Sequence, residues 1–266
     1  MMITIKSQRE IERMREAGKI TAAARRVGRQ MLRDGVTTEE INNEIHKFIL
    51  SCGATPTFLG YGGFPKSACI SVNDEVIHGI PGKRIVRNGD IVSIDVGACV
   101  GFQGIDPKTK LPIGGFHGDC AGTYPVGQVS DEAMRLIQVT EQSFWEGIKN
   151  AIPGNRVSDI SRAVQNYVES NGFSVVREYV GHGVGAHMHE APEVPNYVTK
   201  RRLGGDPRLV KNMTIAVEPM VNMGGPAIKQ LDQWTVLTAD GQYAAHYENT
   251  ILITDGAPEV LTTCGD

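Results

Sequence analysis

The chain has 266 residues, 41% hydrophobic and 21% charged, the ordinary composition of a soluble globular protein of one large domain or two small ones. A net charge of −3 excludes the broad basic field of a DNA-binding protein. Five cysteines without a C-x-x-C pair are typical of reduced thiols rather than of a disulfide framework or a zinc ribbon. No secretory signal or membrane-spanning run is found, so we expect a cytoplasmic protein without a membrane partner.

The first half of the chain predicts two helices followed by strands. Ser7 and Glu10 have the spacing of a capping box, and apolar residues recur every three to four positions from Ile11 to Met31, which predicts a helix over 7–33. The next predicted elements are a helix over 38–51, a loop rich in glycine and aromatic residues over 58–66, and strand-like segments over 68–72, 90–96 and 116–126.

The second half repeats this order. Helices are predicted over 130–151 and 158–170, and strand-like segments over 173–176, 214–218, 235–238 and 248–254. A shift of 119 residues places Gly35 on Gly154, and a shift of 123 places the strand ending at Asp95 on the strand ending at Glu218. Each half therefore delivers a carboxylate from the same strand position, which favours an internal duplication.

The repeat predicts the fold class. We expect one α+β domain over 1–266, built of two pseudo-symmetric halves over about 7–126 and 130–254. Helices should cover one face of a curved, mainly antiparallel sheet. A site formed by both halves should lie between them, which is a usual place for a binding cavity.

Two Asp, two Glu and one His stand at strand ends or glycine-rich turns: Asp95, Asp119, His182, Glu218 and Glu248. Each alone would also suit a turn, a solvated strand end or a structural histidine. A carboxylate buried in an apolar strand is costly unless it is paired or bound to metal. Carboxylates prefer hard or borderline cations, and one imidazole admits Co, Mn, Fe or Zn. Together the five residues predict a site for two divalent metal ions.

Such a site has a defined chemistry. Two metal ions bridged by carboxylates can generate a hydroxide near neutral pH and can stabilise the developing oxyanion, as they do in aminopeptidases. A further carboxylate can take a proton as general base and return it as general acid. The ligand set therefore predicts a hydrolase.

Seven motifs, spread over nearly the whole chain, carry a family resemblance. They are Y-G-G-F-P-K-S-A-C-I-S-V-N-D-E-V-I-H-G-I-P (61–81), G-D-I-V-S-I-D-V-G (89–97), G-F-H-G-D (115–119), G-H-G-V-G-x-x-M-H-E-A-P (181–192), V-E-P-M (217–220), D-Q-W-T-V-L-T (232–238) and Y-E-N-T-I-L-I-T (247–254). Their combination resembles the type I methionine aminopeptidases of the pita-bread metallopeptidase family. The resemblance implies removal of the initiator methionine from nascent proteins when the second residue is small and uncharged.

The resemblance also implies roles for the five metal-binding candidates. Asp95 would bind one ion, His182 and Glu218 the other, and Asp119 and Glu248 would bridge the two. Hydrolysis would proceed through metal-activated hydroxide, with Glu218 as the proton shuttle.

Substrate-binding roles follow from the same resemblance. His78 would contact the substrate backbone beyond the scissile bond, and His189 would hydrogen-bond the scissile amide and stabilise the tetrahedral intermediate. The side chain of the N-terminal methionine would lie among Tyr61, Phe64, Cys69, Met188 and Trp234. Aromatic faces and sulfur suit a thioether, although ordinary core packing also accounts for such residues. Met188 stands where the family often has an aromatic residue.

One segment departs from the family pattern. Asp95 and Asp119 are 24 residues apart (119 − 95), about twice the gap in compact members. The additional residues, about 101–114, are polar and rich in Gly and Pro, so we expect a surface loop at a hairpin tip that leaves the ligand geometry intact.

The resemblance makes nascent polypeptide N-termini the expected partner, with the ribosome as a candidate meeting place, and we expect a monomer. Two alternatives stay open. A proline-specific relative would share all five ligands but would carry an additional N-terminal domain and lack the methionine pocket. A non-catalytic binding protein on the same scaffold would usually have lost ligands.

Overall fold

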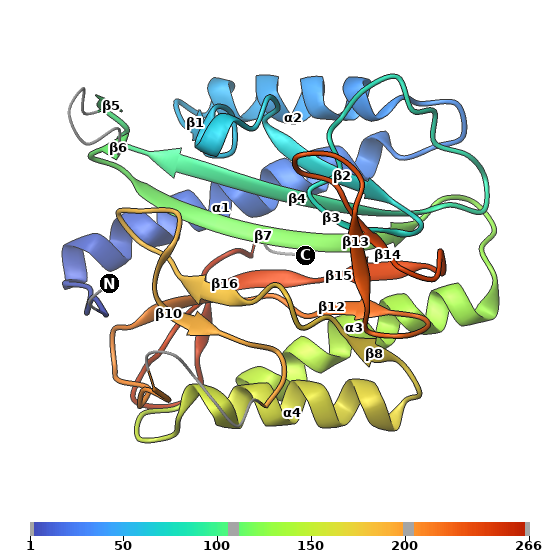
Figure 1. Cartoon of the computed structure of the whole chain (residues 1–266). Helices are drawn as coiled ribbons and strands as arrows, with labels where there is room; N and C mark the ends of the chain where they lie inside the picture. The colour runs from blue at the N-terminus through green and yellow to red at the C-terminus, as the bar shows by residue number, and fades with distance from the viewer. Residues whose placement is uncertain (1–2, 106–111, 199–204, 264–266) are drawn as a thin grey trace.

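The computed structural model describes residues 3–105, 112–198 and 205–263, and these contain four α-helices around antiparallel sheets (Figure 1). The helices are α1 (Gln8–Met31), α2 (Thr38–Ser51), α3 (Asp131–Ile148) and α4 (Val157–Ser170), with one 3-10 turn, η1 (Tyr61–Gly63). The strands are β1 (Thr55–Pro56), β2 (Ala68–Val72), β3 (Glu75–Ile77), β4 (Ile91–Val100), β5 (Gly104–Ile105), β6 (Pro112–Ile113), β7 (Phe116–Pro125), β8 (Ser174–Val175), β9 (Gly181–Gly183), β10 (Glu190–Val194), β11 (Thr214–Val217), β12 (Met220–Asn222), β13 (Ile228–Gln230), β14 (Val236–Thr238), β15 (Ala244–His246), β16 (Glu248–Leu252) and β17 (Glu259–Val260).

A serine cap starts the first helix of each half. Ser7 and Glu10 form the predicted capping box, in which Ser7 N donates to Glu10 Oε2 at 2.7 Å. Ser130 Oγ accepts from the backbone N–H of Ala133 at 3.1 Å at the start of α3. Each cap satisfies a donor that the first helical turn leaves unpaired.

The main sheet is curved and antiparallel, and its strand order is β1-β4-β7-β16-β11-β9-β10. The long pair β4 and β7 lies near its centre, in register from Ile91 opposite Pro125 to Val100 opposite Phe116. β2 adds to β4, and β17 adds to β16. Figure 1 shows α1 and α2 on the upper half and α3 and α4 on the lower half, which confirms the predicted α+β class.

The interior divides into two main hydrophobic clusters. One packs α1 and α2 on β2 and β4, with Ile45 and Ile94 fully buried. The other packs α3 and α4 against β11 and β16, with Phe144, Ile160 and Ile215 fully buried. This division follows the two predicted halves, and the duplication itself stays a prediction.

Most predicted elements are confirmed, and their ends differ for local reasons. The helix predicted over 38–51 has the predicted ends. The helix predicted over 130–151 ends at Ile148, because the chain turns before Pro153, and a residue that precedes proline disfavours the helical region. The strand predicted over 90–96 continues to Val100, because β7 pairs with it along its whole length.

Residues ahead of α1 fix the loop that carries His189. Lys6 Nζ lies 2.6 Å from Oε2 of Glu190, and the two side chains are only 4% and 7% exposed. Thr4 also donates to this carboxylate, and the other oxygen of Glu190 accepts from His187 N at 3.1 Å. The N-terminal segment therefore holds the loop next to His189 through one buried ion pair.

We expect Lys6→Met to lower the free energy of unfolding by about 3–5 kcal/mol, because it leaves the Glu190 carboxylate buried without its cation. Urea denaturation at a fixed metal concentration measures the loss. Lys149→Met is the matched control: Lys149 pairs with Glu146 on the surface at 65% exposure, where such pairs contribute about 0–1 kcal/mol. Equal free energies of unfolding for the two variants would show that the ion pair of Lys6 with Glu190 does not stabilise the fold.

The segment predicted as an insertion extends the β4–β7 hairpin. Gly104 pairs with Ile113 and Ile105 with Pro112, so β5 and β6 form a short ribbon beyond the end of β4 and β7. Figure 1 places this ribbon at the upper left corner of the molecule. The central part of the predicted loop, 106–111, lies outside the described residues.

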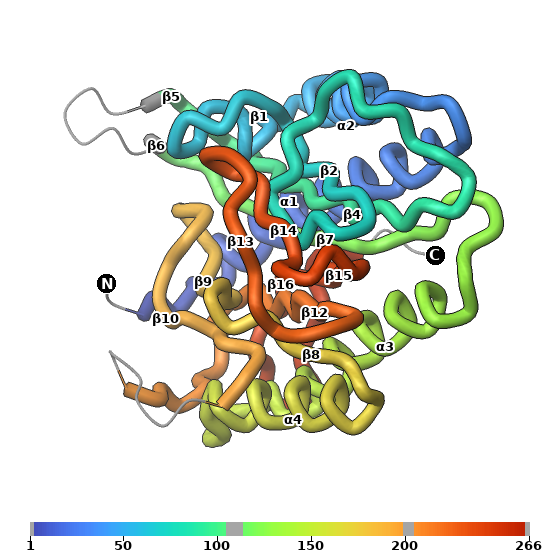
Figure 2. The backbone as a smooth tube through the Cα atoms, turned by 45° about the vertical axis from the view of Figure 1, so that its right-hand side comes forward, coloured from blue at the N-terminus to red at the C-terminus, as the bar shows by residue number. Residues whose placement is uncertain are grey.

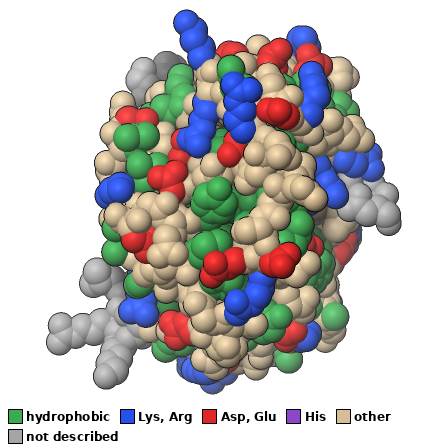
Figure 3. All heavy atoms as spheres, turned by 90° about the vertical axis from the view of Figure 1, so that its right-hand side faces the viewer, with side chains coloured by type: hydrophobic (Ala, Val, Ile, Leu, Met, Phe, Trp, Pro, Cys, Tyr) green, Lys and Arg blue, Asp and Glu red, His purple; other side chains and the backbone are tan. Residues whose placement is uncertain are grey.

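The outer surface is mixed in charge on the side that Figure 3 displays. Lys and Arg side chains alternate there with Asp and Glu around a group of hydrophobic side chains. That face therefore has no broad basic field. Among the described residues, no helix combines the length and the apolar character that a bilayer crossing requires.

Candidate metal centre

Strand register brings three acids to one face of the central sheet. Asp95 on β4 lies opposite Ala121 on β7, and Ala121 also lies opposite Glu248 on β16. Asp119 precedes Ala121 by two positions, so its side chain points to the same face. Ala121 is fully buried, and its methyl group leaves room between the flanking acids.

His182 comes from β9, where a glycine stands on each side of it. A Cβ at Gly181 would lie 2.4 Å from the carbonyl oxygen of Ala216, and a Cβ at Gly183 would lie 2.3 Å from that of Ala191. Only glycine therefore lets β9 fit between β10 and β11. His182 Nδ1 donates to the Gly183 carbonyl at 2.8 Å, which leaves Nε2 free to bind a metal.

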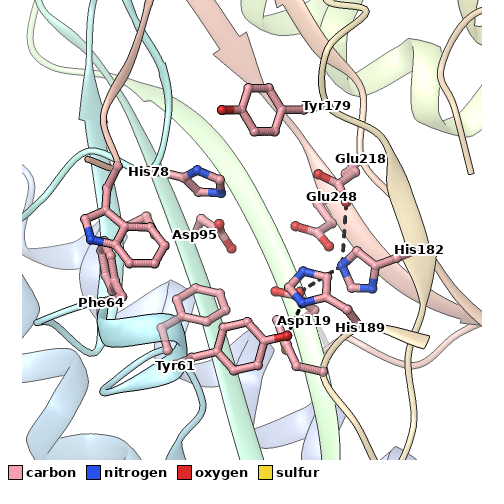
Figure 4. Close-up of a pocket in the computed structure, with 14 residues that line it drawn as sticks. Tyr61, Phe64, His78, Asp95, Asp119, Tyr179, His182, His189, Glu218 and Glu248 are labelled. Atoms are coloured by element: carbon pink, nitrogen blue, oxygen red, sulfur yellow. Dashed lines mark hydrogen bonds and ion pairs between the residues drawn. The ribbon is translucent and has the colours of Figure 1, made fainter. Parts of the chain in front are cut away.

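The ligand candidates converge in the close-up of Figure 4. His182 Nε2 lies 3.6 Å from Oδ2 of Asp119 and 3.6 Å from Oε1 of Glu218. Two groups have potential ligand atoms that all lie within 4.8 Å of one another: Asp119, His182 and Glu248 form one, and Asp95, His246 and Glu248 form the other. The side chain of Glu248 belongs to both groups, so the geometry supports two adjacent metal positions.

Burial and mutual repulsion dominate the electrostatics of the cluster. Burial raises the pKa of Asp95 to about 7, although the Arg25 guanidinium partly offsets it. Burial, followed by the charges of neighbouring carboxylates, raises the pKa of Asp119, Glu218 and Glu248 well above the usual range. Each acid raises the pKa of its neighbours, because a second negative charge nearby disfavours the ionised form.

A metal pair fits these residues. Three buried acceptors, Oδ1 of Asp95, Oδ1 of Asp119 and Oε1 of Glu248, have no hydrogen-bond partner among the described residues. Unpaired buried oxygens are costly, and divalent cations would satisfy them. Burial lowers the pKa of His182 to about 3, so the imidazole is neutral, as a metal ligand must be.

One cavity of about 300 Å³ unites all the predicted site residues. The five metal-binding candidates line it together with both histidines and the five residues of the predicted methionine pocket: Asp95, Asp119, His182, Glu218, Glu248, His78, His189, Tyr61, Phe64, Cys69, Met188 and Trp234. The tube in Figure 2 shows the β13–β14 hairpin in front of the main sheet, where Trp234 approaches Gly62 of η1. The structure thus brings the predicted residues together, and their roles stay predictions.

The two predicted catalytic histidines approach the cavity from different sides (Figure 4). His189 Nδ1 lies 2.6 Å from the Tyr61 hydroxyl, and its ring centroid lies 4.2 Å from that of His182. His78 has a backbone φ of +59°, which is uncommon for a residue with a side chain, and packs edge-on against Tyr179 at 5.6 Å. Burial lowers the pKa of His78 to about 4, so this imidazole is neutral at pH 7.

Sequence reasoning missed three residues of the site. Phe58 and Tyr179 line the cavity, and His246 joins the second ligand group. His246 precedes Glu248 by two positions, a spacing that places both side chains on one face of an extended chain and could have indicated it. Phe58 and Tyr179 come from irregular segments, for which the sequence offers no periodic signal.

Comparison with known proteins identifies the class. Residues 12–255 match the model of metallopeptidase family M24, and the chain belongs to this family. Metal-dependent peptide hydrolysis is thus the chemistry of its class.

The names of its curated relatives give a more specific activity than the family description does. A methionine aminopeptidase of Clostridium perfringens is 50% identical over 98% of this chain and 99% of its own length. Methionine aminopeptidase 1 of Bacillus subtilis is 47% identical over 98% of this chain and 99% of its own length.

Solved structures agree with the fold. Methionine aminopeptidase of Thermotoga maritima superposes with a TM-score of 0.89 at 42% identity, over 98% of this chain and 100% of that one. This match confirms the predicted pita-bread fold. Prolidase of Pyrococcus furiosus superposes with a TM-score of 0.75 at 19% identity, over 98% of this chain but 66% of that one, which is a likeness of fold alone.

Proposed function

We propose that this chain removes the initiator methionine from nascent proteins with the help of two divalent metal ions. One observation carries the proposal. A single cavity has an apolar wall on one part of its surface and, on another, a cluster of four carboxylates together with several imidazoles. The apolar wall suits a methionine side chain, and the polar cluster suits the metal-assisted hydrolysis of the adjoining peptide bond.

The apolar wall is built for a thioether. Phe58, Phe64, Cys69 and Met188 form one buried cluster, and Trp234 packs edge-on against Phe64 with 5.4 Å between ring centroids. Polarizable sulfur and aromatic rings attract a methionine side chain more than they attract a polar one. The first residue of the substrate would therefore lie here.

Five side chains would hold the two ions: Asp95, Asp119, His182, Glu218 and Glu248. This mixture of carboxylates and imidazole suits Co, Mn, Fe or Zn. Divalent ions bound there supply activation of water for attack and polarisation of the scissile carbonyl.

The chain's own residues would orient the substrate and move the protons. Glu218 is partly open to the cavity, so it can take a proton from water and return it to the leaving amine. His189, oriented by the Tyr61 hydroxyl, would donate a hydrogen bond to the scissile amide. His78 would contact the backbone beyond that bond.

Further properties follow from this assignment. His78, Tyr61 and Phe64 line the cavity, and we propose that steric limits near them restrict the second residue of the substrate to a small, uncharged one. The partner would be the N-terminus of a nascent polypeptide at or near the ribosome, not DNA. We propose a cytoplasmic monomer of one domain, in which residues 101–114 are dispensable for metal binding.

Peptide hydrolysis with defined metals tests the proposal. Metal-free protein would be assayed on Met-Ala-Ser, Met-Leu-Ser and Ala-Pro-Ala, and again after addition of Mn, Co or Fe. We expect metal to restore cleavage of Met-Ala-Ser alone. Cleavage of Ala-Pro-Ala would favour the proline-specific alternative, whereas a folded protein without activity under any metal would favour a binding protein.

We expect Phe64→Ala to lower kcat/KM for Met-Ala-Ser by about 10- to 100-fold, because an aromatic side chain in the methionine pocket contributes roughly 1.5–3 kcal/mol. Steady-state kinetics at saturating metal measure the change. Phe102→Ala is the control, since that ring lies exposed on the β5–β6 side of the molecule. An unchanged kcat/KM in the Phe64 variant would place methionine elsewhere.

A further inference from the structure

His246 lies close to both glutamates of the site, two residues before Glu248 in the chain. It is the last residue of β15 and pairs with Met220 of β12, two residues beyond Glu218. Its ring Nε2 lies 3.9 Å from Oε2 of Glu218 and 3.7 Å from Oε2 of Glu248. The imidazole of His246 is therefore close to the carboxylates of both glutamates.

The surroundings of His246 hold the residue in this place. Its backbone N–H donates to Thr123 Oγ1 at 2.8 Å, and the same hydroxyl donates to its carbonyl at 2.9 Å. The residue is 2% exposed, so the imidazole has little freedom to turn towards water. Thr123 belongs to β7, four residues after Asp119, so the metal-binding strand itself positions this histidine.

The Nε2 atom of His246, which is the ring nitrogen near the acids, is buried and lacks a hydrogen-bond partner among the described residues. Its distances to both carboxylates exceed hydrogen-bonding range, so direct pairing does not explain the placement. Two atoms that bind one ion from about 2.0–2.2 Å each lie about 3–4 Å apart, which agrees with this spacing.

We propose that His246 is a sixth metal ligand, which binds through Nε2 at the position formed with Asp95 and Glu248. This inference rests on the proposed two-metal function and adds a residue to it. Each position then has one Asp, one His and a share of Glu248. A second imidazole makes the Asp95 position more favourable for Zn, Co or Fe than an all-oxygen site, which would suit Mg or Mn.

Zinc binding to the wild-type protein tests the proposal without any variant. Protein labelled with 15N-histidine would be titrated with Zn²⁺ to two equivalents, and the ring nitrogen resonances of its seven histidines would be followed by NMR. We expect two histidines to show the shift of a coordinated nitrogen. A single coordinated histidine, with two zinc ions bound, would overturn the proposal.

Variants assign the resonance of the second coordinated histidine and measure how much His246 contributes to zinc affinity. We expect His246→Gln to remove one coordinated resonance and to weaken binding of one zinc equivalent by about 10- to 100-fold or more in calorimetry. His46→Gln, the same change at a histidine of α2 that bonds Ser67 and does not line the cavity, should alter neither. Unchanged zinc affinity in a folded His246→Gln protein would contradict the assignment.

The same samples separate this inference from the proposed function. Hydrolysis of Met-Ala-Ser by the wild-type protein would be measured at two zinc or cobalt equivalents. Two coordinated histidines without cleavage would support His246 as a ligand and would count against the aminopeptidase function. Cleavage with only one coordinated histidine would support the aminopeptidase function and would count against His246 as a ligand.

Discussion

Glu218→Gln is expected to lower kcat for Met-Ala-Ser by about 10²–10⁴-fold, because an amide can neither accept the proton of water nor return it to the leaving amine. Glu218 is the glutamate whose carboxylate is partly open to the cavity, and it lies 3.6 Å from His182. The variant would be assayed at saturating metal, with bound metal counted in the same sample so that lost affinity is distinguished from lost chemistry.

The same substitution should stabilise the metal-free protein. In the absence of metal, burial and the charges of Glu248 and Asp95 raise the pKa of Glu218, so its carboxylate disfavours folding. A neutral amide removes this repulsion and should raise the stability by about 1 kcal/mol. Glu193→Gln, an exposed change on β10, is the control for both measurements. A fully active Glu218→Gln enzyme would refute the proton-shuttle role.

Glu248→Gln is expected to weaken both metal positions together, because Glu248 alone belongs to both ligand groups. An amide is a poorer ligand than a carboxylate and carries no charge, so we expect a loss in affinity of more than about 100-fold for each ion. Competition with a chromophoric chelator measures each step, and Met-Ala-Ser hydrolysis should fall in parallel.

The outcome of this substitution distinguishes two arrangements. If only one ion is lost from Glu248→Gln, this carboxylate serves one position and the two groups are independent. Loss of both ions supports a shared ligand at the centre of the pair. Metal binding in Glu193→Gln should equal that of the wild-type protein, because that side chain points to solvent.

Residues whose chemistry and strand position are both distinctive could be predicted from the sequence. Asp95 lies within the apolar strand β4 and Glu218 directly follows the apolar strand β11, and a buried acid in such a place is costly without a partner. The structure also gives a reason for the two glycines beside His182, since a Cβ added at either one would lie within 2.4 Å of a carbonyl oxygen. The helix ends were predictable where a cap is local, as at Ser7 and Glu10.

Residues that act through distant contacts could not be predicted. His246 ends the short strand β15, and its place beside the acids depends on the pairing of this strand with β12, which has no strong periodic pattern. The ion pair of Lys6 with Glu190 joins segments 184 positions apart. Such a contact forms only when the sheet is assembled. The sequence around Lys6 would suit a solvent-exposed lysine equally well, so it does not indicate a buried ion pair.

Anomalous diffraction from crystals grown with Mn²⁺ or Co²⁺ would test the central claim most directly. We predict two anomalous peaks, both within ligand distance of Glu248, one beside His182 and Asp119 and the other beside Asp95. Metal peaks away from these residues, or none in a protein that cleaves Met-Ala-Ser, would contradict the account.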